Sequence, residues 1–151
     1  MTPARIAIVD DDPAFSQYLA MLLGSRGYEV RTYSSGADLL RALGGVPPPD
    51  VVLLDVLMPG MDGLETLRAA RLAQPGLQVI MLSGMQVPAT IVDAVRLGAI
   101  DYVVKPDDPE GLGEAALEAA IRSAVEKLAL TSEVARLRAQ VVDDPDGAQP
   151  C

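Results

Sequence analysis

The chain has 151 residues, half of them hydrophobic, with 12 Lys and Arg residues against 21 Asp and Glu residues and no histidine. Without imidazole it cannot run a Ser-His-Asp or Cys-His mechanism, use a histidine general base, or build a zinc site that needs histidine. Its formal charge of -9 repels phosphate backbones, and one Phe with four Tyr offers little for stacking bases, so we expect no direct nucleic-acid binding by this chain.

The length suits one domain, whose core hides roughly two-thirds of the unfolded surface. The single cysteine, Cys151, cannot form an internal disulfide, which fits a reducing compartment. No segment approaches the roughly 18 uninterrupted apolar residues of a membrane span, and the N-terminal MTPARIAIVDDD does not resemble a signal peptide. We therefore expect a cytoplasmic protein without a membrane segment.

Five short apolar runs recur along the chain, and each is followed by a turn and by a stretch with helical spacing. They cover residues 4–9, 28–33, 51–54, 77–82 and 101–104. All except 28–33 are too continuous for a strand with one wet face, so we expect strands buried on both faces, as in a parallel sheet covered by helices.

Helices are predicted between these strands. The first begins at Pro13, with Asp12 as its N-cap, and ends before Gly27, which suits a left-handed C-terminal cap. The others are expected from after Ser35 to before Gly44, over 63–73, over 88–97, and from about 109. Strict alternation over five units predicts an α/β fold, a doubly wound five-stranded parallel sheet.

Polar side chains follow four of the five predicted strands. They are Asp10, Asp11 and Asp12 after the first strand, Asp55 after the third, Ser83 after the fourth and Lys105 after the fifth. Ligands of doubly wound sheets bind outside the carboxyl ends of the strands. We therefore expect at least three carboxylates, one hydroxyl and one ammonium to converge on one edge.

Clustered carboxylates repel one another, and a hard divalent cation resolves this, since Mg²⁺ is held by one or two carboxylates with water and substrate phosphate. Asp11 and Asp55 are the best candidate ligands, with Asp10 nearby. Asp55 can then attack phosphorus and become an aspartyl phosphate. Metal and Lys105 would neutralise the phosphoryl oxygens, and the Ser83 hydroxyl would donate a hydrogen bond to one of them.

Four motifs stand in order at the ends of the predicted strands: IVDDDP at 8–13, LLDVLMPGMDG at 53–63, VIMLSG at 79–84 and DYVVKP at 101–106. Over about residues 4–125 the sequence resembles the receiver domain of two-component response regulators, the CheY-like superfamily. The resemblance implies a flavodoxin-like strand order 2-1-3-4-5 with five helices, the fifth extended at the C-terminus. It also implies that Asp10 and Asp11 help to bind Mg²⁺ and that Asp55 is the phosphoacceptor.

Further residues gain roles from the resemblance alone. The backbone carbonyl of Leu57 would complete the metal site. Ser83 falls on the switch hydroxyl, Lys105 on the invariant lysine, and Tyr102 on the aromatic residue that swings inward when that hydroxyl moves. The Lys105-Pro106 bond resembles the family's cis peptide, which X-Pro bonds tolerate.

Two positions that tune self-dephosphorylation in the family hold Leu57 and Met85 here. Neither side chain can position an attacking water, so we expect slow self-dephosphorylation. Simpler structural readings stand beside these roles: Asp12 as a helix cap, Ser83 as a turn former, and Tyr102 as a partly buried core residue.

The C-terminal stretch carries two apolar stripes on nearly opposite sides of a helix. They are Leu117, Ile121, Ala124 and Leu128, then Leu130, Val134, Leu137 and Val141. One straight helix cannot bury both stripes on its own domain. Either the chain breaks near Thr131-Ser132 and folds back, or it continues and packs on a partner as a short coiled coil. We expect a receiver domain over 1–128, a helical extension over 129–143 and a disordered tail over 144–151.

The leading function is a phosphorylatable switch rather than an enzyme, with a histidine kinase or histidine phosphotransfer protein as partner. It would change the surface of its fourth helix, fifth strand and fifth helix, to control an output domain or partner. A homodimer through that surface or the C-terminal helix stays open, as does whether the receiver stands alone or belongs to a longer protein. The alternatives are a haloacid-dehalogenase-type phosphatase, which wants an aspartate where Leu57 stands, and a docking module that takes no phosphate.

Overall fold

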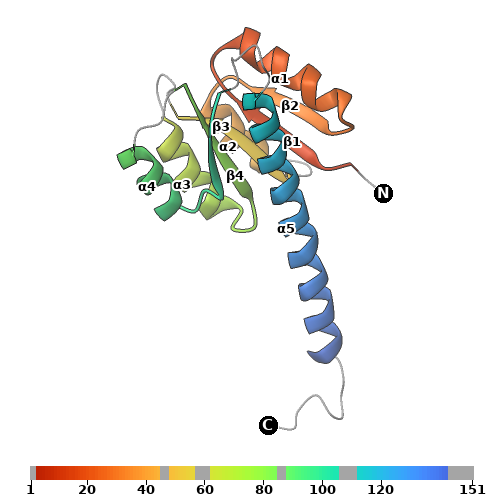
Figure 1. Cartoon of the computed structure of the whole chain (residues 1–151). Helices are drawn as coiled ribbons and strands as arrows, with labels where there is room; N and C mark the ends of the chain where they lie inside the picture. Colours follow the sequence, from red (N-terminus) through yellow and green to blue (C-terminus); the bar gives the residue numbers. More distant parts are fainter. Residues whose placement is uncertain (1–2, 45–47, 57–61, 85–87, 106–111, 143–151) are drawn as a thin grey trace.

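The structure is a computed structural model of the chain, and it describes residues 3–44, 48–56, 62–84, 88–105 and 112–142. Five parallel strands form one sheet, in the order β2-β1-β3-β4-β5. The strands are β1 Arg5–Val9, β2 Glu29–Tyr33, β3 Val51–Asp55, β4 Gln78–Ser83 and β5 Asp101–Val104. The predicted doubly wound sheet and its strand order are confirmed (Figure 1).

Helices alternate with the strands along the whole described chain. They are α1 Pro13–Ser25, α2 Gly36–Leu43, α3 Gly63–Ala73, α4 Pro88–Arg96 and α5 Leu112–Val142. Asp12 caps α1 by accepting hydrogen bonds from the backbone N–H groups of Ala14 and Phe15. Gly27 follows α1 with a φ of +95°, the left-handed conformation that glycine adopts without strain.

The helices cover the sheet in two layers. One core cluster joins the sheet to α1 and α5, and the other joins it to α2, α3 and α4. Every residue of β3 and β4 is buried, as predicted for central parallel strands. The prediction fails for β5, where Asp101 is exposed and Tyr102 and Val104 are only partly buried, because β5 lies at an edge of the sheet.

The last helix, α5, is continuous from Leu112 to Val142, so the alternative in which the chain breaks and folds back is wrong. Its first stripe docks on the sheet, with Leu117, Ile121 and Ala124 buried. Leu130 and Leu137 of the second stripe are exposed. Figure 1 shows α5 running out past one end of the sheet.

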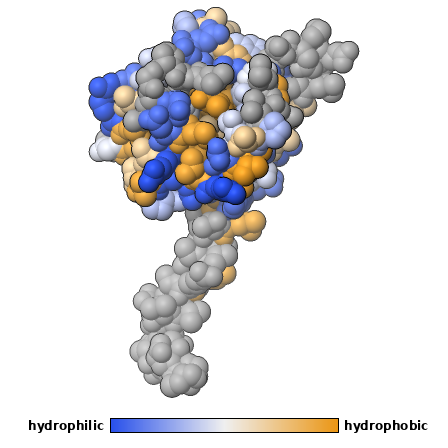
Figure 2. All heavy atoms as spheres, turned by 90° about the vertical axis from the view of Figure 1, so that its left-hand side faces the viewer, coloured by the Kyte–Doolittle hydropathy of each residue, from blue (hydrophilic) through white to orange (hydrophobic). Residues whose placement is uncertain are grey.

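The surface over α3 and α4 mixes apolar and polar side chains (Figure 2). The exposed apolar residues there are Leu72, Val92 and Val95. Among the helices that the structure describes, none combines the length and the apolar character needed to cross a bilayer.

Candidate functional site

Four polar residues stand where β1, β3, β4 and β5 end. Asp10 follows β1, Asp55 ends β3, Ser83 ends β4 and Lys105 follows β5. Backbone pairing continues one residue past two of these strands, because Asp10 N–H donates to the Tyr33 carbonyl and Lys105 N–H donates to the Ser83 carbonyl. Pairing within the sheet therefore fixes the backbone positions from which the Asp10 and Lys105 side chains extend.

Three carboxylates meet at this edge. Each of Asp10, Asp11 and Asp55 offers an oxygen, and the three oxygens lie within 4.8 Å of one another. Asp10 and Asp55 are buried, at 2% and 4% exposed, while Asp11 is exposed to solvent. Asp10 also accepts a hydrogen bond from the backbone N–H of Asp12, at 3.0 Å. An all-oxygen donor set of this size, open on one side, fits a hard divalent cation that keeps some of its waters.

Lys105 bridges two of these carboxylates. Its Nζ lies 2.8 Å from Asp10 Oδ2 and 3.4 Å from Asp55 Oδ2. Burial lowers the pKa of Lys105, but the hydrogen bond to Asp10 and the charges of Asp55 and Asp10 outweigh burial, so the net pKa is raised above 10.5. Stabilisation from these ion pairs is thus complete below the unfolded pKa and is lost as pH rises through the higher folded pKa.

A third contact of the Lys105 ammonium was not predicted from the sequence. The Nζ lies 4.8 Å from the centre of the Phe15 ring, on the first turn of α1. The Phe15 and Tyr18 ring centres are 6.2 Å apart, and the Tyr18 hydroxyl donates a hydrogen bond to Glu114 of α5. In the sequence Phe15 is one apolar residue among several at helical spacing, so nothing there distinguishes it from a core residue.

The backbone beside Asp55 is packed tightly against the start of α3. A Cβ on Gly63 would lie 2.3 Å from the carbonyl oxygen of Asp55 and 2.7 Å from the Cα of Val56. Gly63 N–H also donates to the Val56 carbonyl, at 3.0 Å. Only glycine permits this approach, which fixes the backbone of Asp55 from the side of α3.

Ser83 and Tyr102 lie on neighbouring strands. Ser83 is 3% exposed, and Tyr102 is partly buried against the core cluster under α2, α3 and α4. The Tyr102 hydroxyl is buried, and the part of the chain that the structure describes offers it no hydrogen-bond partner. This position is compatible with both readings of Tyr102, the switch residue and the core residue. The predictions for Leu57, Met85 and the Lys105-Pro106 bond lie outside the described residues.

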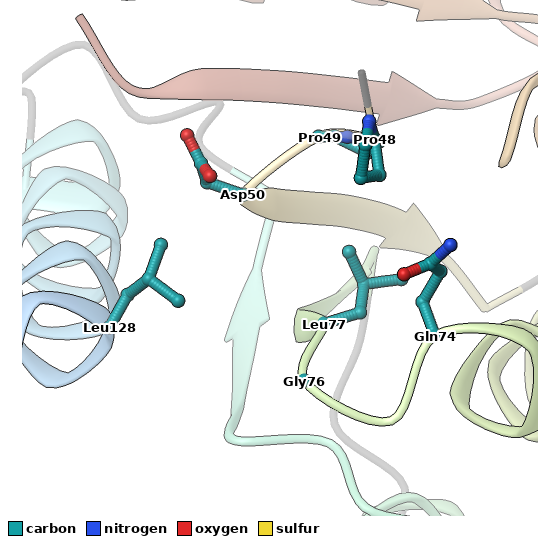
Figure 3. A pocket seen from close by; sticks show the side chains of 7 residues that line it. All are labelled: Pro48, Pro49, Asp50, Gln74, Gly76, Leu77 and Leu128. Atoms are coloured by element: carbon teal, nitrogen blue, oxygen red, sulfur yellow. The ribbon is translucent and has the colours of Figure 1, made fainter. Parts of the chain in front are cut away.

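Within the part of the chain that the structure describes, two of the hollows lie at opposite ends of the sheet. One, of about 310 Å³, adjoins the acidic cluster and is lined by Asp10, Asp11, Pro13, Ser16, Gln17, Thr32, Tyr33 and Ser34. The other, of about 190 Å³, lies at the amino ends of β3 and β4. It is lined by Pro48, Pro49, Asp50, Gln74, Gly76, Leu77 and Leu128. There Leu128 points from α5 toward the loop between α3 and β4 (Figure 3). The second hollow holds none of the predicted site residues.

Comparison with known proteins agrees with this arrangement. The family model of the response regulator receiver domain matches residues 6–117. The chain belongs to the response regulator receiver family. It is 36% identical over 108 residues to the DNA-binding response regulator MtrA of Mycolicibacterium smegmatis, an alignment that covers 72% of this chain and 46% of MtrA.

Two further similarities extend this comparison. The transcriptional regulatory protein GlrR of Escherichia coli is 36% identical over 122 residues, which cover 81% of this chain and 27% of GlrR. A beryllofluoride-activated receiver domain of DrrB superposes with a TM-score of 0.69 at 30% identity, covering 82% of this chain and 98% of that one. The chain therefore spans less than half the length of the curated relatives that it matches.

The comparison corrects one expectation. Exclusion of nucleic acid as a partner is wrong for these proteins, because MtrA is a DNA-binding response regulator. The formal charge of -9 and the low aromatic content belong to these 151 residues. The charge of this segment determines its own electrostatic potential. It does not determine whether the other part of a longer relative such as MtrA binds DNA.

Proposed function

We propose that this receiver accepts a phosphoryl group on Asp55 from a phosphohistidine donor and, in response, changes its α4, β5 and α5 surface to control an output domain or partner. The observation that carries the proposal is the convergence of three carboxylates within 4.8 Å, two of them buried and paired with Lys105. Burying that much charge at a sheet edge is costly unless a ligand uses it.

Asp10, Asp11 and Asp55 would hold Mg²⁺, and the Leu57 carbonyl is proposed as a further ligand from the family resemblance. When bound, Mg²⁺ supplies positive charge that screens the carboxylates and the incoming phosphoryl oxygens. The buried position of Asp55 at the end of β3 points its carboxylate to that edge and limits the access of water.

The transfer forms one bond and breaks one. A carboxylate oxygen of Asp55 bonds to phosphorus, the P–N bond to the donor histidine breaks, and its electron pair stays on the imidazole nitrogen. Lys105 turns from Asp55 to the new phosphoryl oxygens, which lie within reach of an ammonium already 3.4 Å from that carboxylate. Ser83, buried at the end of the neighbouring β4, donates a hydrogen bond to one of them.

The proposed switch follows from these new bonds. Because Ser83 ends β4, its movement toward the phosphoryl group displaces the end of that strand. β5 pairs directly with β4 there, through Ser83 and Val104. Tyr102, whose hydroxyl is buried without a described partner, lies one strand away from that movement. The two packings would differ in population rather than in fold.

We propose that the chain is not an enzyme, since its phosphoryl group stays on Asp55 and leaves only by slow hydrolysis. A phosphatase of the haloacid dehalogenase type needs an aspartate at the position where this chain has Leu57. The receiver family assignment also argues against that alternative. The proposed place of action is the cytoplasm, where reducing conditions suit a chain with one cysteine.

The test is to incubate the chain with Mg²⁺ and a small acyl phosphate and to look for an acid-stable, base-labile phosphoryl adduct. Asp55→Asn should abolish the adduct, and chelation of the metal should do the same. Asp50→Asn is the matched control, because Asp50 precedes the same strand that Asp55 ends. An adduct that persists in Asp55→Asn would sink the assignment, and a wild-type chain that takes no label would favour the docking module.

A further inference from the structure

Besides its two carboxylate partners, the ammonium of Lys105 contacts an uncharged group, the ring of Phe15. Its Nζ lies 4.8 Å from the centre of the Phe15 ring, well inside the roughly 6 Å range of a cation–π contact. The side chain of Lys105 is 22% exposed, so the contact is partly shielded from water. It joins the end of β5 to the first turn of α1.

We infer that Phe15 is a positioning residue for Lys105: its ring holds the ammonium beside the phosphoacceptor without competing for the phosphoryl oxygens. The inference deepens the proposed function and rests on it. No motif of the sequence assigns a role to Phe15.

The carboxylate partners of the lysine change during the proposed reaction. Asp55, at 3.4 Å, becomes the site of the new bond, and Asp10, at 2.8 Å, would share its oxygens with the metal. Both anionic partners of the ammonium therefore change during the reaction. The Phe15 ring stays neutral, attracts the cation through its π face and offers no carboxylate oxygen, so its contact survives while the N–H groups of Lys105 turn to the phosphoryl oxygens.

The ring is held in place from two sides. Phe15 packs against the core cluster between α1, α5 and the sheet, and its backbone N–H is capped by Asp12 at 3.3 Å. On its outer side lies the Tyr18 ring, with centroids 6.2 Å apart and planes tilted by 41°. Tyr18 is itself tied to Glu114 at the start of α5 by a hydrogen bond from its hydroxyl. A ring fixed in this way restricts the lysine that lies over it.

The simpler explanation is that Phe15 only fills the core, and paired substitutions separate the two. Phe15→Leu keeps an apolar side chain and removes the π face, whereas Phe15→Tyr keeps the π face. In the full chain, at saturating Mg²⁺ and acetyl phosphate, Phe15→Leu should lower the maximal rate of Asp55 labelling about three- to tenfold. Phe15→Tyr should stay within about twofold of wild type. Equal losses in both variants would overturn the inference.

Stability is measured beside the rate, by urea unfolding of each variant. A rate loss in Phe15→Leu that remains under conditions where the chain is fully folded supports positioning. The background of Lys105→Met gives a second control, because a residue that acts through the lysine should cause no further loss there. A full additional loss in that background would assign Phe15 to packing alone.

A readout without phosphoryl transfer keeps this inference apart from the proposed function. The aromatic ring should shift the Nζ-adjacent methylene protons of Lys105 upfield in the NMR spectrum of the wild type and of Phe15→Tyr, and the shift should vanish in Phe15→Leu. If the wild type takes no label, the proposed function fails and this shift still tests the contact. If the wild type is labelled and Phe15→Leu is labelled equally fast, only the role of Phe15 fails.

Discussion

The two ends of the parallel sheet use carboxylates differently. At the carboxyl end, Asp10 and Asp55 are buried and share the ammonium of Lys105. At the amino end, Asp50 is only partly buried and accepts a 2.8 Å hydrogen bond from the backbone N–H of Arg5. Asp50 completes the pairing of the sheet, which is a structural task. Asp10 also accepts a backbone N–H, from Asp12, but Asp10 and Asp55 are in addition buried side by side around one ammonium, an arrangement that suits action on a ligand.

Removal of the ammonium should destabilise the carboxyl end. Lys105→Met removes the ammonium that pairs with both Asp10 and Asp55, so we expect the free energy of unfolding at pH 7 to fall by about 2 kcal/mol, allowing for partial exposure of the lysine. Urea unfolding in a chelator and in Mg²⁺ measures this. The metal should restore more stability in the variant than in wild type, and an equal gain in both would count against the metal site.

Glycines at the two ends offer a matched pair. A Cβ on Gly63 would strike the backbone of Asp55 and Val56, whereas a Cβ on Gly76 meets nothing within 4 Å. Gly63→Ala should cost about 1–3 kcal/mol and slow the labelling of Asp55. Gly76→Ala should be neutral or stabilise the fold by a few tenths of a kcal/mol. Thermal unfolding with a labelling assay tests both, and similar effects of the two variants would contradict the packing argument.

The smallest effect is expected from Asp50 itself. Asp50→Ala removes the acceptor of the Arg5 N–H and should lower the free energy of unfolding by about 1 kcal/mol. The rate of Asp55 labelling should not change, because the lost hydrogen bond lies at the other end of β3. A loss of labelling with retained stability would mean that the two ends are coupled.

Much of the fold followed from the sequence because local signals were strong. Asp12-Pro13 marked the start of α1, Gly27 its end, and the apolar run at 51–54 the central β3. The burial of β5 was overestimated, since its four residues show no sign of whether another strand lies beyond them. Edge position is a property of strand order rather than of composition.

The sequence predicted which charged residues form the site, but it did not predict the contact between Lys105 and Phe15. Strand ends brought Asp10, Asp55 and Lys105 to one edge, which topology alone implies. The ring of Phe15 over the lysine could not be foreseen, because helical spacing does not say which rotamer an apolar residue takes at the rim of a core. The continuity of α5 past Leu130 was likewise one of two alternatives that spacing allowed.

That continuity makes α5 a lever. At 1.5 Å per residue its 31 residues span about 46 Å, and Leu117, Ile121 and Ala124, which pack on the sheet, lie in its first half. Its first turn is tied to Tyr18 near the site, and it passes the opposite end of the sheet at Leu128. The second half is about 23 Å long, so a tilt of about 5° where it leaves the sheet displaces the last turn by about 2 Å. A small change of helix direction at the edge of the core is therefore enlarged, by leverage alone, at the far end of the helix.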